Sequence, residues 1–383
     1  MKTVGIICEY NPMHRGHKKQ IDEIRRIHGD DTAVVCLMSG NFVQRGAPAI
    51  VDKALRTRAA LGSGADLVLE LPIEYALSSA EGFAAGGVRI LGPFCDALCF
   101  GAETPDQNSL LSIAQALLSE EFPPRLKDEL STGKSFPAAR QATLEAMGLD
   151  AAILERPNNI LAVEYCKAIL SQGCSMEPMP IFRGGSYHDQ SPDPENPSAT
   201  AIRNLMLDGR DPGAYLPQGV SLEGAKLHDL AAGERAILSR LRTMTDAEFE
   251  ALPYGSEGLW RKFMHACRSE ATLEEIIAAT KSKRYTRTRI DRMVMCAFLG
   301  LTVADLLSPV PYVRVLGFTD RGRRVLKAAR KTGTFLNAGD ISLTPYGERE
   351  RIIGDLYGLF CADGPEAPGI EAKRRIVYLE DAK

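Results

Sequence analysis

The sequence contains no uninterrupted apolar run of the roughly 18 residues that a membrane-spanning helix needs. Its first residues, MKTVGIICEYNP, have neither a long apolar segment nor a small-residue cleavage site, so we expect no secretory signal peptide. Positive charge is not in excess either, because 46 basic residues face 49 acidic ones and the net charge is −3. This balance excludes a global basic field for nucleic acid and leaves only a local basic patch open.

Cysteine pairs of the metal-binding or redox kind are also missing. The nine cysteines form no CxxC motif, and Cys95 and Cys99 have no second pair that would complete a metal site. We therefore predict reduced thiols, a cytoplasmic location and no metal ion held by the side chains. With 45% hydrophobic and 25% charged residues over 383 positions, and no internal repeat, the chain has the composition of a globular protein of two or three domains.

Short apolar segments alternate with helical stretches in the first part of the chain. The pattern predicts strands at residues 3–9, 33–38, 65–71 and 97–101, with helices at 16–28, 52–63 and 80–92 between them. Apolar strands separated by helices are typical of βαβ units. We therefore predict an α/β, Rossmann-like fold with a mostly parallel sheet, which binds ligands beyond the carboxyl ends of its strands.

The middle of the chain is expected to be mainly helical from 109 to 170. A proline-rich segment at 177–180 then leads into a short run at 180–183. A loop rich in glycine, aspartate and proline follows at 184–197. Ser198 is the expected N-cap of a helix at 200–207, because serine side chains accept hydrogen bonds from the first free backbone amides.

A domain boundary is expected at 208–219, which contains three glycines and two prolines. This boundary divides the chain into an α/β domain at 1–210 and a mainly helical, basic region at 220–383. Within the second part we expect a helical pattern to about residue 301, and then a final segment that holds residues 312–318, a basic helix at 322–331 and a less regular tail.

The most informative local pattern is His14-Arg15-Gly16-His17, which opens the helix after the first strand. Glycine lets the backbone approach a ligand closely, and a helix N-terminus offers free N–H groups to a phosphate. Two imidazoles three residues apart lie on nearly one helix face, so both could bind nucleotide phosphates. A capped surface turn and a metal pair are the alternatives. The metal pair is disfavoured because no third histidine or cysteine has suitable spacing.

This motif is similar to that of the HxGH nucleotidylyltransferases, a Rossmann-like superfamily that transfers AMP or CMP from a nucleoside triphosphate and releases pyrophosphate. A second string, Ser198-Ala199-Thr200-Ala201-Ile202-Arg203, resembles the superfamily's ISSTxIR signature. In that signature a capped helix and its arginine hold the β- and γ-phosphates, which suits a helix N-terminus combined with a guanidinium.

Further strings narrow the resemblance. They are SGNFVQRGAPAIVDK, GADLVLELPIEYALSSAEGFA, CFGAE, PNNILAVEY and SKRYTRTRIDR. Together they resemble the tRNA(Met) cytidine acetate ligase family, and the resemblance extends from residue 1 to about residue 317. It implies that acetate and ATP form acetyl-adenylate and pyrophosphate, and that the acetyl group passes to N4 of the wobble cytidine of elongator tRNA(Met). ATP is then the co-substrate and Mg²⁺ is expected to accompany it, while the oligomeric state stays open.

The resemblance also implies the site residues. His14 and His17 would be the catalytic pair. The ATP-binding set would comprise Ile7, Cys8, Glu9, Tyr10, Asn11, Pro12, Met13, His14, Arg15, Gly16, His17, Lys18, Lys19, Gln20, Gly101, Asn158, Arg183 and Arg203. Asn159 is adjacent to Asn158, so a displacement by one residue is possible at that position.

Two basic segments are candidates for tRNA binding. Residues 281–292 hold six basic residues in twelve, with one acid and one tyrosine, and residues 321–331 hold six in eleven. Lysine and arginine suit phosphate, and an exposed aromatic ring can stack on a base. Solvated basic helices are the alternative interpretation. The predicted tRNA-binding residues are Lys281, Lys283, Arg284, Tyr285, Arg287 and Arg289.

An acetate or tRNA contact and a structured polar loop are both open for Ser39, Asn41, Gln44 and Arg45, whereas Asp66 and Glu70 favour a structural role.

The first rival function is a coenzyme-biosynthetic adenylyltransferase of the HxGH superfamily, whose chains are usually shorter and lack these strings. The second is a non-enzymatic RNA-binding module, against which the intact histidines and Arg203 argue.

Overall fold

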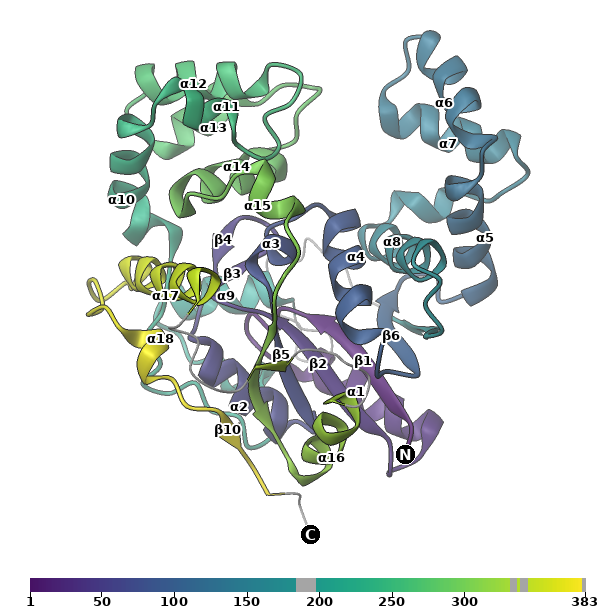
Figure 1. Ribbon diagram of the computed structural model, residues 1–383, viewed down its shortest axis with the longest axis vertical. Coiled ribbons are helices and arrows are strands. Elements are labelled where there is room, and N and C mark those ends of the chain that lie inside the picture. The colour runs from purple at the N-terminus through teal and green to yellow at the C-terminus, as the bar shows by residue number, and fades with distance from the viewer. Residues whose placement is uncertain (184–197, 331–335, 338–343, 381–383) are drawn as a thin grey trace.

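The fold is built on one mixed sheet with helices on both faces (Figure 1). The computed structural model describes residues 1–183, 198–330, 336–337 and 344–380. The strand order is β10-β8-β5-β2-β1-β6-β7, and β9 pairs with β8. The strands are β1 (Thr3–Cys8), β2 (Ala33–Ser39), β5 (Leu67–Leu71), β6 (Ala97–Ala102), β7 (Glu177–Phe182), β8 (Val313–Phe318), β9 (Leu336–Asn337) and β10 (Val377–Tyr378), while β3 (Phe42–Val43) and β4 (Ala47–Pro48) form a separate hairpin.

Strand β2 shows why the sheet is covered on both faces. All seven of its residues are buried, as expected of a central parallel strand. Val34 and Cys36 pack into the core under α1 and α2, while Val35 and Leu37 face the core under α4, α8 and α16. The helices next to the sheet are α1 (Arg15–His28), α2 (Lys53–Gly62), α3 (Ile73–Ala76), α4 (Ala80–Leu91), α8 (Pro157–Ser171) and α16 (Asp320–Ala329).

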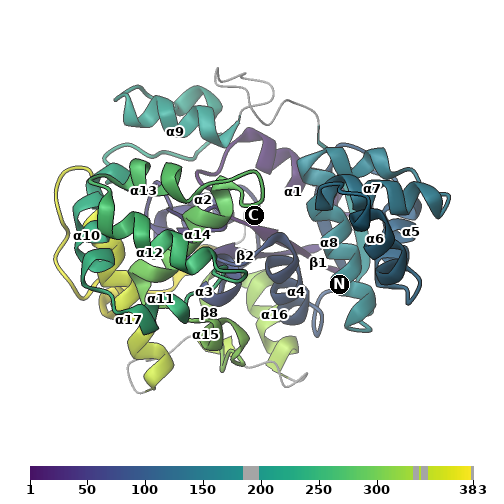
Figure 2. The same cartoon turned by 90° about the horizontal axis from the view of Figure 1, so that it is seen from above.

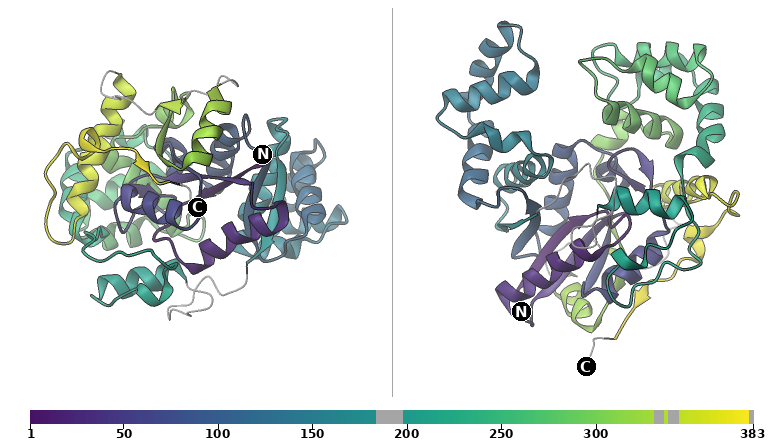
Figure 3. Two further views of the ribbon diagram at one scale, coloured as in Figure 1. Left: turned by 90° about the horizontal axis from the view of Figure 1, so that it is seen from below. Right: turned by 180° about the vertical axis from the view of Figure 1, so that it is seen from behind.

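Two groups of helices rise beyond the end of the sheet at which β1 and β2 stop (Figure 1 and Figure 3). The first contains α5 (Gln107–Leu118), α6 (Phe122–Ser131), α7 (Phe136–Ala146) and η1 (Ala151–Glu155). The second contains α10 (Leu230–Thr243), α11 (Asp246–Glu250), α12 (Leu259–Ser269), α13 (Leu273–Thr280), α14 (Arg287–Leu299) and α15 (Val303–Leu307). It shares a core with the last helical elements, α17 (Pro345–Tyr357) and η4 (Gly358–Phe360), and α18 (Ile370–Lys373) follows. No helix among the described residues is long and apolar enough to cross a bilayer.

The predicted fold class is confirmed, with one addition. Within the described part of the main sheet, all strand pairs are parallel except β5 with β8. Strands β8 and β10 come from the second half of the chain but pair into the sheet of the first half. The chain after residue 220 is therefore helical up to α15 and then returns to the sheet. A domain division between 210 and 220 stays a prediction.

Strand β7 overlaps the short run predicted at 180–183 but begins three residues earlier. The strand covers Glu177–Phe182 although Pro178 and Pro180 interrupt its donors. Among the described residues it pairs with β6 on one side alone, so it is an edge strand. Edge strands tolerate proline because their outer N–H groups bond no neighbour. The sequence pattern could not show this edge position.

A buried arginine joins the ends of β1 and β2. Arg56, on α2, is only 1% exposed. Its guanidinium donates to the carbonyl oxygens of Glu9 at 2.7 Å, Ser39 at 2.9 Å and Val51 at 3.1 Å, and also to that of Gly40. The carbonyls of Glu9, Ser39 and Gly40 lie where the two central strands end and their loops begin, and that of Val51 lies just before α2. The arginine therefore satisfies backbone groups that no strand partner can reach.

We expect Arg56→Met to lower the free energy of unfolding by about 3–5 kcal/mol, because it leaves several buried carbonyl groups without a donor. Denaturant unfolding followed by circular dichroism measures the change. Arg58→Met is the matched control, since Arg58 is an exposed residue of the same helix, and it should change stability by less than about 0.5 kcal/mol. Equal losses in both variants would contradict this role for the guanidinium.

Candidate active site

The loop between β1 and α1 is held from three sides. The Glu9 carbonyl accepts from Arg56, and the Glu9 carboxylate accepts from the backbone N–H of Gln44 at 2.9 Å. The Asn11 side-chain oxygen accepts from the backbone N–H of Ile50 at 2.7 Å. The loop is thus fixed by the segment that follows β2, and it delivers the next residues to the start of α1 in one conformation.

The two histidines form an unusual helix cap. His14 is the N-cap of α1, and its Nδ1 accepts from the backbone N–H of Gly16 at 3.1 Å. Nδ1 of His17 accepts in return from the backbone N–H of His14 at 3.3 Å. The two rings stack with their centroids 3.7 Å apart. A Cβ atom on residue 16 would lie 3.0 Å from Cε1 of His14, so glycine leaves room for the ring to fold back.

Both imidazoles are held neutral. Burial, reinforced by the charges of Arg183 and Arg203, lowers the pKa of His14 to about 3. Burial, followed by the influence of His14 and Arg183, lowers the pKa of His17 well below its usual range. Because each Nδ1 accepts a backbone N–H, the single ring proton belongs on Nε2. Nε2 of His14 is buried and has no hydrogen-bond partner among the described residues, so it is available as a donor.

The second predicted motif lies against the first. Helix α9 (Ala199–Leu207) begins at the predicted cap, where the Ser198 hydroxyl accepts from the backbone N–H of Ala201 at 3.1 Å. Arg203 donates to the Asn11 carbonyl at 2.7 Å and to the Thr200 hydroxyl at 3.0 Å. Figure 2 shows α9 on the α1 side of the sheet. The two motifs are therefore brought together although they are far apart in the sequence, and η2 (Gly213–Tyr215) follows α9.

Gly101, Asn158 and Arg183 meet beside this pair of motifs. A Cβ atom on Gly101 would lie 3.1 Å from Cδ of Arg183, so the arginine side chain passes directly over the glycine. The Arg183 guanidinium donates to Oδ1 of Asn158 at 3.2 Å. Asn159 is fully buried and its oxygen accepts from the backbone N–H of Thr104 at 3.0 Å. Asn158 is thus the asparagine that faces Arg183.

Much of the predicted segment from Ile7 to Gln20 supports the loop instead of facing the histidines. Met13 is buried in the core under α1 and α2, and so is Tyr10, although the Tyr10 ring also lies against that of His17, with the centroids 4.9 Å apart. Gln20 donates to the backbone carbonyl of Cys99 at 3.3 Å. Lys18 pairs with Asp22 on the helix surface. Other members also lie off the imidazole pair: Ile7 and Cys8 pack at the rim of the two cores, Arg15 donates to the Leu216 carbonyl, and Lys19 is exposed.

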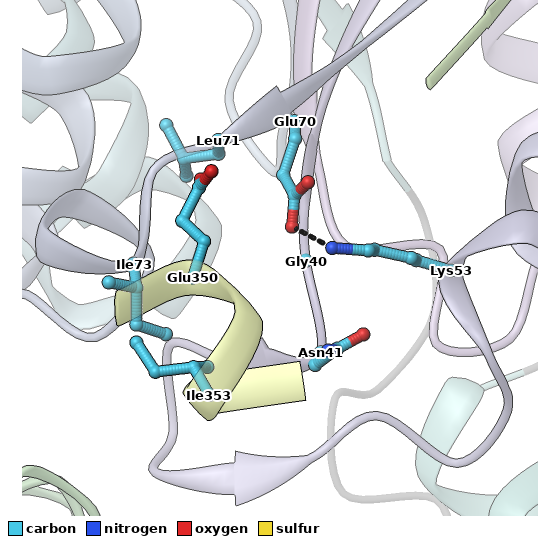
Figure 4. A pocket seen from close by; sticks show the side chains of 8 residues that line it. All are labelled: Gly40, Asn41, Lys53, Glu70, Leu71, Ile73, Glu350 and Ile353. Atoms are coloured by element: carbon cyan, nitrogen blue, oxygen red, sulfur yellow. Dashed lines mark hydrogen bonds and ion pairs between the residues drawn. The ribbon is translucent and has the colours of Figure 1, made fainter. Parts of the chain in front are cut away.

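A small cavity beyond β2 and β5 is lined by Gly40, Asn41, Lys53, Glu70, Leu71, Ile73, Glu350 and Ile353 (Figure 4). Lys53 lies between Glu70 at 2.6 Å and Glu371 at 3.0 Å, and Asn41 donates to Glu371 at 3.2 Å. Burial raises the pKa of Glu350 to about 7. The space is about 20 Å³, enough for about one water molecule. These residues hold the chain together, which favours the structural alternative for Asn41 and Glu70.

Asp66 has the structural surroundings that the sequence favoured. Its carboxylate accepts from the backbone N–H of Val34 at 2.8 Å and pairs with Arg25 at 3.0 Å. Arg321 lies 3.6 Å away, at the start of the basic helix α16. Because Asp66 precedes β5, this second basic segment begins at the amino ends of the strands, opposite the histidines.

The first basic segment, residues 281–292, lies toward the opposite end of the sheet, beyond the carboxyl ends of the strands. There α14 packs against the β3–β4 hairpin. Lys281, Lys283 and Arg284 are exposed there, and Arg284 pairs with Glu257 at 2.8 Å. The remaining arginines are engaged within the protein: Arg287 pairs with Glu274 and Arg289 donates to the Tyr254 carbonyl.

Tyr285 corrects the sequence interpretation. We expect an aromatic ring within a basic segment to be available for stacking on a base, but Tyr285 is only 9% exposed. Its hydroxyl donates to the Glu257 carbonyl at 3.3 Å, and the guanidinium of Arg289 lies 5.1 Å from the ring centroid. The ring is part of the core of the second helical group, which the local sequence could not reveal.

Glu103, which follows β6, was not among the site residues expected from the sequence. Its carboxylate accepts from the side chain of Asn158 at 2.7 Å and from the backbone N–H of Asn159 at 2.9 Å. The string CFGAE contained this residue, but nothing in its spacing linked it to an asparagine 55 positions away. No group of three or more histidine, cysteine, aspartate or glutamate residues suited to a metal ion occurs in the described part of the chain.

Known proteins share this architecture. Residues 1–339 match the family model described as HIGH Nucleotidyl Transferase. The tRNA(Met) cytidine acetate ligase of Acetivibrio thermocellus is 35% identical over 417 aligned positions, which cover 99% of this chain and 100% of the relative. That of Clostridium novyi is 38% identical over 352 positions, covering 86% and 88% of the two chains.

Two crystal structures of Thermotoga maritima TmcAL have the same fold. The apo form superposes with a TM-score of 0.90 at 29% identity, and the form bound with alpha-thio ATP superposes with a TM-score of 0.87 at 28% identity. Each comparison covers 99% of this chain and 100% of the other. With the paired histidines, the Arg203 helix and these full-length relatives, the chain belongs to the HIGH nucleotidyl transferase family and, within it, to the tRNA(Met) cytidine acetate ligases.

Proposed function

We propose that this protein is an ATP-dependent acetate ligase that forms acetyl-adenylate and transfers the acetyl group to N4 of the wobble cytidine of elongator tRNA(Met). The observation that carries the proposal is the neutral histidine pair with Arg183 and Arg203 beside it. Family membership supports the substrates. All nine cysteines are unpaired, which supports a cytoplasmic location.

In the first step, an acetate oxygen attacks the α-phosphorus of ATP. The new carbon–oxygen–phosphorus linkage forms as the bond to the β-phosphate oxygen breaks, and pyrophosphate leaves with that bond's electrons. The Nε2–H groups of His14 and His17 would donate to oxygens on the reacting phosphate, while Arg183 and Arg203 offset the charge of the leaving pyrophosphate. No protein nucleophile is needed, because acetate supplies the attacking oxygen and the site supplies position.

In the second step, the N4 amine of the cytidine attacks the acetyl carbonyl. AMP leaves and the amine loses a proton, which gives N4-acetylcytidine. The exposed side chains of Lys281, Lys283 and Arg284 would contact tRNA phosphates. Mg²⁺ is expected to accompany ATP. The described residues offer no carboxylate cluster that fits it, so phosphates and water would supply its ligands.

A coenzyme-forming adenylyltransferase would use the same histidines and differ in its acceptor. The second helical group, which carries the basic residues, favours the tRNA acceptor. Labelled acetate, ATP, Mg²⁺ and total tRNA therefore test the function directly. We expect label in N4-acetylcytidine after digestion of the RNA. ATP-dependent pyrophosphate release that requires another small acceptor, with no labelled RNA, would instead favour the coenzyme function.

His17→Ala should lower the rate of acetyl-adenylate formation about a hundredfold or more, because it removes a positioned donor to the reacting phosphate. Acetate-dependent exchange of labelled pyrophosphate into ATP measures this step without tRNA. His265→Ala, at an exposed position on α12, is the matched control and should exchange at the parent rate. A fully active His17→Ala variant that is folded would refute the catalytic role.

The buried neutral His14 should also make stability depend on pH. Its pKa is 6.5 in the unfolded chain and about 3 in the folded protein, so only the unfolded chain binds the proton between these values. The contribution is complete above pH 6.5 and is lost as the pH falls toward 3. At pH 4.5 the loss is about 2–3 kcal/mol relative to pH 7.

His14→Asn keeps a side-chain acceptor at the cap and should remove this part of the pH dependence. Denaturant unfolding at pH 7 and pH 4.5 measures the difference, and His265→Asn should retain the parent's dependence. If His14→Asn loses as much stability on acidification as the parent, the histidine is not buried in its neutral form.

Lys283→Glu should lower kcat/KM for tRNA roughly tenfold and reduce its salt dependence, because a phosphate contact is lost and a repulsive charge is added. Acetate-dependent pyrophosphate exchange should be unchanged, since that step needs no tRNA. Lys327→Glu, on α16 at the far end of the sheet, serves as the control and should leave both activities intact. A larger effect of Lys327→Glu would place the tRNA on the opposite end of the molecule.

A further inference from the structure

Glu103 has an arrangement of contacts that goes beyond capping a helix. One carboxylate oxygen accepts from the backbone N–H and the side-chain NH₂ of Asn158, at 3.3 and 2.7 Å. The other accepts from the backbone N–H of Asn159 at 2.9 Å. Both oxygens are thus occupied at the first turn of α8, where Arg156, the N-cap residue, makes no side-chain cap bond.

The carboxylate determines which way the Asn158 amide points. A carboxylate only accepts hydrogen bonds, so the NH₂ group of Asn158 must face Glu103. The amide oxygen is then directed away from Glu103 and toward Arg183, whose Nη1 donates to it at 3.2 Å. With the amide reversed, its NH₂ group would face the guanidinium, and neither group could accept.

Arg183 is thereby restrained at two points. Its aliphatic part lies over Gly101, where a Cβ atom would approach Cδ to 3.1 Å, and its guanidinium is held by the Asn158 oxygen. The positive charge of Arg183 contributes to lowering the pKa of both His14 and His17. An arginine held in this way keeps its orientation without losing side-chain entropy when an anion binds.

We propose that Glu103 is a positioning residue for nucleotide binding: it orients the Asn158 amide so that Arg183 is held facing the phosphate site beside the two histidines. This inference rests on the proposed use of ATP. Glu103 does not itself touch the nucleotide and acts through the other two side chains. The substitution Glu103→Gln replaces an obligate acceptor with a group that has one acceptor and one donor, at nearly unchanged volume.

The test is a double-variant cycle on the full chain, with the dissociation constant for ATP measured by titration calorimetry. Glu103→Gln should weaken ATP binding about tenfold, and Arg183→Ala should weaken it at least as much. In the Arg183→Ala background, Glu103→Gln should add less than about twofold, because its effect passes through the missing arginine. In pyrophosphate exchange, Glu103→Gln should raise KM for ATP about tenfold and change kcat less than about threefold.

Asp106→Asn is the matched control. Asp106 also caps a helix near the same loop, accepting from the backbone N–H groups of Asn108 and Ser109, but has no contact with Asn158 or Arg183. It should bind ATP like the parent. Melting temperatures of all variants separate a general loss of stability from a loss of binding.

Each outcome bears on a different claim. Failure of the parent to bind ATP would refute the proposed function. A parent that binds ATP together with a Glu103→Gln variant of equal affinity would overturn the positioning role, as would equal effects of Glu103→Gln with and without Arg183. If Glu103→Gln does not fold, Asn158→Ala takes its place, because it keeps the carboxylate cap. Additive effects of Asn158→Ala and Arg183→Ala would then overturn the inference.

Discussion

The buried guanidinium of Arg56 is the interaction on which the geometry of the site depends. A charge in the interior requires a full set of acceptors, and the carbonyls where β1 and β2 end, together with that of Val51, supply them. The same bonds fix the start of the loop that leads to His14 and of the loop that follows Ser39. One side chain thus determines where both polypeptide segments leave the sheet, and the ligand-binding end of the fold is built around it.

The position of the histidine pair depends on these hydrogen bonds of Arg56. Once the loop from Glu9 is fixed, His14 lies at the start of α1 as its cap. Nδ1 of each imidazole then accepts a hydrogen bond from a backbone N–H. The remaining nitrogen must carry the proton, so the backbone of the helix selects the tautomer that can donate to a phosphate. Arg183 and Arg203 add positive charge nearby and further disfavour protonation. The site therefore offers donors without competing imidazolium charge, and its two cations come from separate segments of the chain.

Local features of the site were predictable from the sequence, and long-range ones were not. The four strands predicted within residues 3–101, which correspond to β1, β2, β5 and β6, depend on apolar runs, and the helix opening at His14 and the cap at Ser198 depend on capping chemistry within a few residues. The structure confirms these features. Burial of Tyr285, the role of Glu103 and the edge position of β7 depend on partners far away in the sequence. The return of β8 to the sheet is of the same kind, because the six-residue segment VRVLGF does not indicate which strand it will pair with.

Helix α2 also determines how the last part of the chain is attached. Lys53, its first residue, lies between Glu70 of β5 and Glu371 of α18, and Arg314 of β8 pairs with Glu371 at 2.6 Å. Arg374 pairs with Asp52, the cap of α2, at 2.6 Å. Buried charges of this kind cost desolvation energy and tolerate few alternative arrangements. The same helix also holds the histidine loop through Arg56. The site and the C-terminal segments are therefore both attached to α2. The second helical group shares its core with α17, so its position relative to the histidines is set through the same C-terminal segments.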